Sequence, residues 1–490
     1  MLTGFTAALL VLGLLAGAVA AETVHGVVVF SRHGDRTTKH YGAQALTSLG
    51  ATQNFQVGSS YRARYLTAGS PHRILNISEF SYVSSQVYAT APSQGILLNT
   101  ATAFLQGLYP PLVGLDPQVA SQTLNNGTNS TSPLNGYQYV TLQGIVGNSP
   151  DAIWIKGDDG CPAYTQAGDS FKQSTEFMTR NAETRGFYRG FFPVLQSVHD
   201  YKSADNMSYA KAYDIFDLIN VARIHNATSP ARSVTDEQLF QLRTLADSAE
   251  FGDNYNRTQP ARSIHAETFA GGVLAQLNKT ITSRGQLKFS LLAGSYDTFL
   301  AFFGLANLTA VDPDFFGLPD YASTMVFELF SSDSASASSF PTDPDAELRV
   351  RFLFKNGTDG ALAAHPLFDS GVDSLAWPDF VDQLQPRAIT TTAEWCSTCQ
   401  SQVDFCAALN QTDSGATASS GGGGSGGGLS NAVAGVIGAM VTLGVVAIVG
   451  ALAFLLLWKR RFALGATPDA GVANGEKRSL RSASHGSGGV

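Results

Sequence analysis

The stretch VVVFSRHGDRTTKH, Val27 to His40, decides the fold that we expect for this chain of 490 residues. It opens with an apolar, β-branched run typical of a buried strand and then breaks into two arginines on either side of a histidine. In open α/β sheets, ligands bind at the carboxyl ends of strands, which is where this charged loop stands. A histidine nitrogen can attack phosphorus while guanidinium groups hold phosphate oxygens, so the pattern favours phosphoryl transfer over a plain surface turn.

Strand-like and helix-like segments alternate along the body of the chain, which predicts an α/β fold. The helical patterns and sequon-bearing loops between about 112 and 262 predict an inserted helical domain. The runs that read as strands are Val24 to Phe30, Gln86 to Thr90 and Leu287 to Ala293. Those that read as helices are 94–107, 174–192, 209–224 and 235–249.

The body carries no feature of a nucleic-acid-binding protein. The formal net charge is −8, the sequence pI is about 5.6, and basic runs occur only towards the C-terminus. Because nucleic acids and anionic lipid surfaces attract clustered Lys and Arg, we expect neither as a partner of the body.

Two apolar segments predict a secreted body that is anchored in a membrane. Residues 1–20 read as a signal peptide, in which an apolar stretch is followed by small residues. Residues 414–430 form a Gly/Ser-rich linker, 432–458 an uncharged run long enough to span a bilayer, and 459–490 a polar, disordered tail that starts with basic residues. The positive-inside rule then predicts a single-pass type I topology with a cytosolic tail, whereas a GPI signal would end in its apolar segment.

Sequons and cysteines point to an extracellular or lumenal body. Ten Asn-X-Ser/Thr sequons precede the second apolar segment, so we expect N-glycans at Asn76, Asn126, Asn129, Asn206, Asn226, Asn256, Asn278, Asn307, Asn356 and Asn410. The four cysteines favour two disulfides, and their pairing stays open: Cys161, Cys396, Cys399 and Cys406. A redox or zinc pair at Cys396-x-x-Cys399 is the alternative, but no second CxxC or suitably spaced histidine accompanies it.

Several segments, in order along the chain, resemble the histidine acid phosphatases of the phosphoglycerate mutase-like superfamily. FSRHGDR at 30–36 looks like the family signature, and agreement continues in LTSLGATQ at 46–53, FLQGLYPP at 104–111, GGVL at 271–274 and LPDYAS at 318–323. The resemblance lies within a domain that we place at 21–413. It implies a large domain with a central, mostly parallel sheet flanked by helices, a smaller helical domain, and hydrolysis of small phosphomonoesters through a phosphohistidine.

The resemblance also implies a role for each site residue. His33 would be the nucleophile, and Arg32 and Arg36 would bind the phosphate. Asp297 would protonate the leaving oxygen. The histidine that usually precedes this aspartate is replaced by Tyr296, which can still donate one neutral hydrogen bond to phosphate.

A second departure concerns a family arginine that completes the phosphate pocket. Counting back from Gly107 places this position at Ile96, so two cationic contacts are absent. Each charge-assisted hydrogen bond contributes roughly 1.5–3 kcal/mol, and losing both from the transition state would slow the reaction by roughly 10² to 10⁴. Four nearby basic residues are expected to be solvated surface side chains rather than replacements: Lys39, His40, His72 and Arg73.

Other candidate sites are weaker, and we expect no cofactor and no metal. His265-Ala266-Glu267 resembles a His-acid pair but begins a helix, which favours a structural role. The spacing of Asp312, Asp314 and Asp320 does not fit an EF-hand calcium loop.

Two functions therefore compete: an acid phosphatase, and a catalytically weakened surface protein that binds a ligand or signals. The first is favoured because His33, Arg32, Arg36 and Asp297 occur together. A soluble mutase of the wider superfamily fits a secreted, glycosylated chain less well.

Overall fold

The computed structural model describes residues 22–332 and 338–409 of the chain. The predicted signal peptide, the linker, the apolar segment at 432–458 and the tail lie outside these ranges. Within them, no helix combines the length and the hydropathy of a membrane span.

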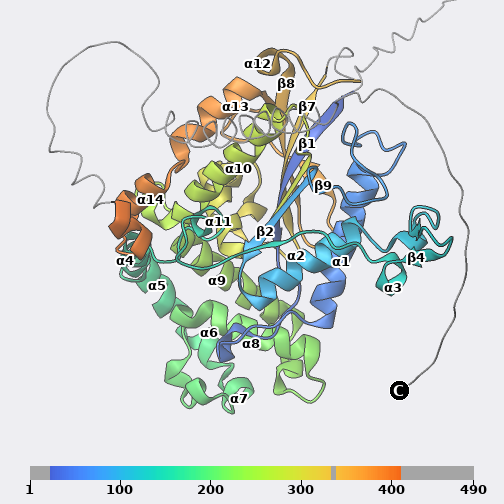
Figure 1. The fold of residues 1–490 in the computed structure, drawn as a ribbon. Helices are drawn as coiled ribbons and strands as arrows, with labels where there is room; N and C mark the ends of the chain where they lie inside the picture. Colours follow the sequence, from blue (N-terminus) through green and yellow to red (C-terminus); the bar gives the residue numbers. More distant parts are fainter. Residues whose placement is uncertain (1–21, 333–337, 410–490) are drawn as a thin grey trace, which may run out of the picture. The chain divides into compact units, whose positions relative to one another are not determined.

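The centre of the body is an eight-stranded mixed sheet (Figure 1). Its order is β10-β8-β7-β1-β6-β2-β5, with β9 paired to β8. The neighbours β1, β6, β2 and β5 run parallel, whereas β7 to β10 pair antiparallel with their neighbours. The strands that carry the site lie near the three predicted runs. The bounds are β1 (Thr23–Arg32), β2 (Val87–Pro92), β5 (Gln143–Ile145), β6 (Phe289–Gly294), β7 (Thr324–Ser331), β8 (Leu348–Lys355), β9 (Leu362–Ala364) and β10 (Ser374–Ala376).

Alternate side chains of β1 enter two apolar cores, which explains why this strand reads as a continuous apolar run. Val28 and Phe30 belong to the core that includes α10, α11 and α13. Val27 and Val29 belong to the core that includes α1 and α2, which lie on the other side of the sheet in Figure 1. The helix bounds are α1 (Ser48–Tyr65), α2 (Gly95–Leu108), α10 (Ile264–Thr282), α11 (Tyr296–Leu305), α12 (Pro344–Glu347) and α13 (Trp377–Leu384).

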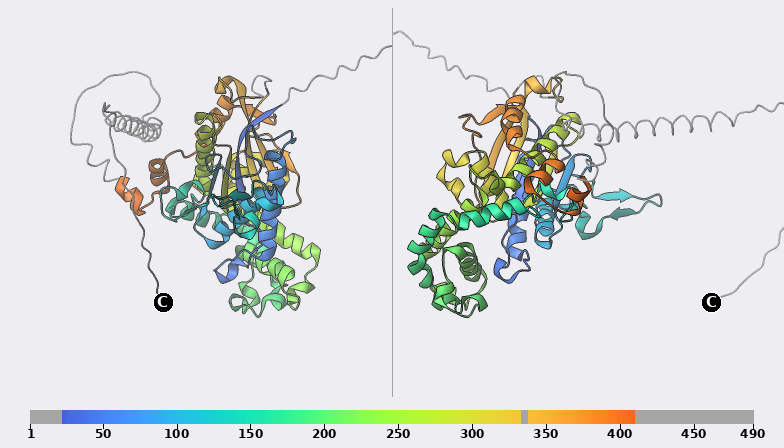
Figure 2. Two further views of the ribbon diagram at one scale, coloured as in Figure 1. Left: turned by 45° about the vertical axis from the view of Figure 1, so that its right-hand side comes forward. Right: turned by 90° about the vertical axis from the view of Figure 1, so that its left-hand side faces the viewer.

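The residues from 162 to 254 form a helical region with an apolar core of its own. Figures 1 and 2 show its helices α6, α7 and α8 next to one another, away from the strands of the sheet. The main contact within it joins α8 to α9. The bounds are α4 (Pro162–Lys172), α5 (Thr175–Glu183), α6 (Arg185–Arg189), α7 (Phe192–Leu195), α8 (Ala212–His225) and α9 (Asp236–Asn254).

The segment before Pro162 differs from the helical insertion that we predicted from about residue 112. It contains β5, which pairs with β2 in the central sheet, and a hairpin of β3 (Ser121–Thr123) and β4 (Asn129–Thr131). The hairpin projects from the rest of the body in Figure 2. These strands are only three residues long and polar, so no run of alternating hydrophobicity marks them in the sequence.

Two disulfides fasten the C-terminal helix α14 (Thr392–Cys399) and the chain that follows it. Cys161 pairs with Cys399, and Cys396 pairs with Cys406. The expectation of two disulfides is therefore confirmed, and the two cysteines of the CxxC spacing do not pair with each other. The first bond joins the start of α4 to the end of the described body.

Candidate active site

The RHGDR loop leaves the sheet at the carboxyl end of β1 and rests on the start of α1. A Cβ atom on Gly34 would lie 2.3 Å from the carbonyl oxygen of Gly50, so only glycine permits this approach. The side chain of Asn54 accepts a hydrogen bond from the Gly34 N–H at 2.7 Å and donates one to the Arg32 carbonyl at 3.1 Å. Packing and hydrogen bonds therefore fix the backbone of the loop.

His33 has the geometry and the protonation state of a nucleophile. Its ring is buried, and Nδ1 lies 2.9 Å from the carbonyl oxygen of Gly34, so Nδ1 carries the proton and donates it. Nε2 then holds the free lone pair and has no hydrogen-bond partner among the described residues. Burial, followed by the positive charges of Arg32 and Arg36, holds the pKa of His33 well below its usual value, so the ring stays neutral.

The two arginines of the loop are buried and each keeps one nitrogen without a partner. Arg32 donates to the carbonyl of Pro319, and its guanidinium lies over the Tyr321 ring, 4.8 Å from the centroid. Arg36 is fully buried. Within the described residues, the Nε atoms of both arginines lack an acceptor, as the histidine Nε2 lacks a donor. The two arginine N–H groups are thus free to donate to an anion, and the lone pair of the histidine is free to attack an electrophilic atom.

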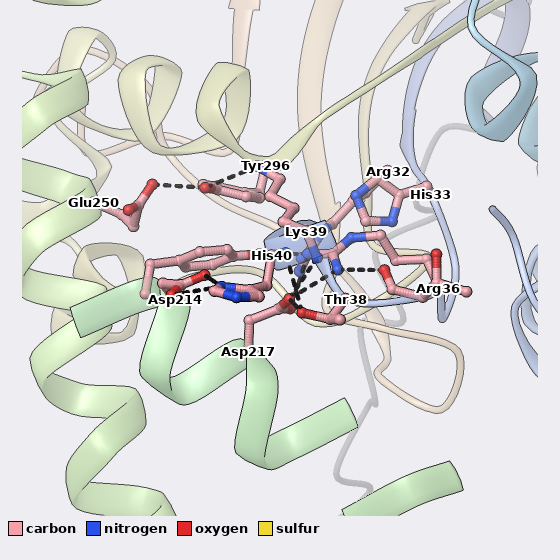
Figure 3. A network of polar contacts seen from close by, with 12 residues as sticks. Arg32, His33, Arg36, Thr38, Lys39, His40, Asp214, Asp217, Glu250 and Tyr296 are labelled. Atoms are coloured by element: carbon pink, nitrogen blue, oxygen red, sulfur yellow. Dashed lines mark hydrogen bonds and ion pairs between the residues drawn. The ribbon is translucent and has the colours of Figure 1, made fainter. Parts of the chain in front are cut away.

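Asp217 of α8 neutralises Arg36 and ties the helical region to the loop (Figure 3). Its Oδ1 lies 3.0 Å from Nη2 of Arg36. Its Oδ2 accepts from Nη1 of Arg36 at 3.2 Å, from the Thr38 hydroxyl at 2.7 Å and from the backbone N–H of Lys39 at 2.8 Å. The hydroxyl of Tyr213, one turn earlier, lies 2.8 Å from the same guanidinium. No motif in the sequence marked either α8 residue.

Asp35, the residue before Arg36 in the signature, has a structural role. Its Oδ1 accepts from the Thr47 hydroxyl at 2.5 Å and lies 2.6 Å from Nε2 of His225 at the end of α8. Thr47 is also the N-cap of α1, accepting from the Gly50 N–H at 3.0 Å. The loop, α1 and α8 therefore meet at one carboxylate.

Tyr296 stands at the first position of α11, where the resemblance places a histidine. Its hydroxyl donates to Glu250 of α9 at 2.7 Å, and its ring stacks on Tyr213 with centroids 5.0 Å apart. Burial, and next the charge of Glu250, raises the pKa of Tyr296 well above its usual value, so it remains a neutral phenol. Burial raises the pKa of Glu250 itself to about 7.

Asp297 follows at the N-terminal end of α11, near the loop because β1 and β6 are parallel neighbours in register. It is half-buried, and its carbonyl oxygen lies 2.9 Å from Nε2 of His265. The half-buried Asp158 is a close neighbour: desolvation, and next the charge of Asp297, raises the pKa of Asp158. A second carboxyl group therefore accompanies the expected acid.

Ile96 belongs to an apolar core. It is buried among apolar side chains on α2, in the core beneath α1 and α2. The turn from Ala91 to Ile96 contains no charged side chain at all, so the missing cation is not supplied by a neighbouring position of that turn.

The expectation that nearby basic residues are solvated is wrong for Lys39 and His40. Nζ of Lys39 lies 3.2 Å from the hydroxyl of Tyr296. The side chain of His40 is only 6 % exposed, and its Nδ1 lies 3.0 Å from Asp214. Arg73 instead donates to backbone carbonyls, at Leu66 and Ile77.

The remaining candidates have structural contacts. His265 belongs to α10 and bonds to the main chain of Asp297, as a structural role requires. Asp312 caps a short helical turn, and Asp320 pairs with Arg243 at 2.7 Å. In the described ranges, no group of His, Cys, Asp and Glu side chains could hold a metal ion.

A cavity of about 430 Å³ adjoins Arg32. Its walls come from α8, from the segment 318–321 and from the turn after β8. They include the rings of Tyr213 and Tyr321, and two sequon residues, Asn356 and Thr358. Nine of the ten sequon asparagines lie in the described residues, and all nine are exposed or half-buried.

Residues 38–355 match the family model of the histidine phosphatase superfamily, branch 2. The chain belongs to this superfamily. The match starts two residues after Arg36, so the placement of the histidine phosphatase signature rests on the loop itself.

Solved structures that match the chain at low sequence identity include two phytases and a multiple inositol polyphosphate phosphatase. The apo phytase of Hafnia alvei is 14% identical, with a TM-score of 0.49 over 78% of this chain and 99% of that one. The phytase from D. castellii is 13% identical, with 0.47 over 80% and 84%, and the multiple inositol polyphosphate phosphatase of Bifidobacterium longum is 12% identical, with 0.45 over 73% and 91%. A comparison with curated proteins found no match.

Proposed function

We propose that this histidine phosphatase hydrolyses phosphate monoesters through a phosphohistidine formed on Nε2 of His33. The observation that carries the proposal is the set of three unpartnered, buried nitrogens on one loop: Nε2 of His33 and the Nε atoms of Arg32 and Arg36. A neutral imidazole beside two guanidiniums suits attack on a phosphorus whose oxygens those cations hold. Buried polar atoms are rarely left unpaired without a function.

The reaction then follows in two steps. The Nε2 lone pair forms a bond to phosphorus while the bond from phosphorus to the ester oxygen breaks, and Asp297 gives that oxygen its proton. In the second step, Asp297 takes a proton from water, whose oxygen attacks phosphorus, and the electrons of the N–P bond return to Nε2. The products are an alcohol and inorganic phosphate, and no cofactor takes part in either step.

The lining of the cavity beside Arg32 favours esters whose leaving group is small and uncharged. Its lining contains Arg32 and Arg243, but also three aspartates, at positions 217, 320 and 359. Asp217 and Asp320 are already paired with arginines. A polyphosphorylated alcohol would therefore find no surplus of positive charge there, whereas the Tyr213 and Tyr321 rings suit an apolar or aromatic group.

A second candidate function is binding of a phosphorylated ligand without turnover. The observation in its favour is that Tyr296 and the uncharged turn at 91–96 replace two cationic contacts expected in the pocket.

We also propose that the body faces the exterior or a lumen as a glycosylated, type I membrane protein, on the strength of residues 1–20, 432–458 and the sequons.

The test is hydrolysis of p-nitrophenyl phosphate by the full-length chain between about pH 3 and pH 8, beside His33→Ala. Turnover that disappears in the variant, together with an acid-labile phosphoryl group trapped on the wild-type chain alone, supports the enzyme. Equal background rates combined with saturable binding of inorganic phosphate would replace the enzyme by the second candidate.

A further inference from the structure

Lys39 occupies the centre of the polar network and has no role in the reaction as described so far. Figure 3 shows it between Tyr296 and Asp217. Its Nζ lies 3.2 Å from the Tyr296 hydroxyl and 4.4 Å from the centroid of that ring, with the Tyr213 centroid at 5.2 Å. The ammonium group thus rests on two aromatic faces, one of them the ring of Tyr296, the residue that replaces the family histidine.

On this geometry, and resting on the proposed function, we propose that Lys39 is the third cation of the phosphate site. Its ammonium group leaves the Tyr296 ring to bind a phosphate oxygen, and so replaces the cationic contacts that Tyr296 and Ile96 do not provide.

The backbone at Lys39 is held while its side chain is only lightly held. Its N–H donates to Asp217 at 2.8 Å, and the preceding residue, Thr38, donates its hydroxyl to the same oxygen. The side chain is half-buried, and among the described residues its ammonium group makes one hydrogen bond, to the neutral Tyr296 hydroxyl. A cation on an aromatic face is held less strongly than one bonded to a phosphate dianion, so arrival of phosphate favours the move.

The charges around the lysine show that it is near the reacting atoms. Lys39 is, with Arg32 and Arg36, one of the three cations whose charges lower the pKa of His33. Burial lowers the pKa of Lys39, while Asp297 and Glu250 oppose that effect. A phosphate dianion would add to this opposition and keep the ammonium group charged.

The experiment measures the affinity of the full-length chain for inorganic phosphate and for orthovanadate by titration calorimetry, independently of turnover. Lys39→Met and Lys39→Gln should each weaken binding by about 10- to 100-fold, while Lys39→Arg should stay within about threefold of wild type. Adding Tyr296→His to Lys39→Met should restore part of the affinity. The control is Lys279→Met. Lys279 also lies over a tyrosine, 5.5 Å from the Tyr88 centroid, but it stands in the last turn of α10, at the opposite end of that helix from His265.

Each outcome separates this proposal from the proposed function. Lys39→Gln loses the charge but can still donate a hydrogen bond to Tyr296. Unchanged phosphate affinity in this variant would therefore overturn the role of the charge. That conclusion would hold even if Lys39→Met weakens binding, because methionine could misplace the Tyr296 ring. Weakened affinity without any turnover in wild type would support Lys39 and remove the enzyme. A wild-type chain that binds neither anion would overturn both.

Discussion

Replacing Asp217 by asparagine tests whether the helical region holds the RHGDR loop in place. In wild type this carboxylate is buried and accepts hydrogen bonds from Arg36, Thr38 and Lys39. Asparagine presents an N–H₂ group where a donor already points, and it removes the charge opposite a fully buried guanidinium. Breaking one side of a buried ion pair costs about 3–5 kcal/mol.

The expected result is a loss of about 3 kcal/mol or more in the free energy of unfolding in urea, measured on the full-length chain. The control is Asp214→Asn, one turn earlier on α8. Asp214 also accepts from two side chains, His40 and Tyr201, but is 26 % exposed and faces no arginine. Its replacement should cost about 1–2 kcal/mol, since water can compensate in part.

A double replacement completes the test. Arg36→Met with Asp217→Leu removes both charges and leaves apolar groups of similar size, which is often close to neutral for stability. We expect this variant to regain part of the lost stability, since the Thr38 hydroxyl and the Lys39 N–H still lack their acceptor, but no phosphate binding. A cost for Asp217→Asn no greater than that of Asp214→Asn would refute the reasoning.

Three further predictions concern stability. Burial lowers the pKa of His25 to about 4, so the free energy of unfolding of wild type should fall as the pH drops from about 6.5 to 4. His25→Gln should reduce that loss by up to roughly 3 kcal/mol in urea titrations. The same dependence of stability on pH in wild type and variant would contradict this prediction. Ile96→Arg should lower the free energy of unfolding by about 3 kcal/mol because it buries a charge, while Gln94→Arg at an exposed position should leave it unchanged. An Ile96→Arg protein as stable as wild type would contradict the placement of residue 96 in the apolar core. Removing the 161–399 disulfide, which closes a loop of 238 residues, should lower the free energy of unfolding by about 5 kcal/mol. Removing the 396–406 disulfide, which closes a much shorter loop, should lower it by about 3 kcal/mol. The reverse order in calorimetric unfolding would count against the argument from chain entropy.

The sequence predicted three strands of the sheet and the place of His33 at a strand end because both are local patterns. The run before Arg32 is apolar on both faces of the sheet, and it stops where the charged loop begins. Hydrophobic periodicity records burial of this kind directly. The α/β class, the three strands near the site and the position of His33 at a strand end could therefore be predicted before any coordinates.

The contacts that complete the site could not be predicted in this way. Asp217 and Tyr213 lie about 180 residues beyond Arg36, in a helix whose polar positions look like an ordinary solvated face. A lysine in a polar loop is usually solvated, so the sequence alone predicts a surface position for Lys39. Only the folded chain brings its ammonium group onto the buried ring of Tyr296.

The shared carboxylate of Asp217 also limits how the gene can recombine. The helical region has its own core and looks like a unit that could be exchanged between homologous genes. Its helix α8, however, carries Asp217, the counter-ion of Arg36 in the signature. A crossover that takes the segment 30–41 from one parent and α8 from another would separate Arg36 from Asp217, as well as Asp35 from His225. Among chimaeras of this protein, we expect the survivors to inherit these two segments together.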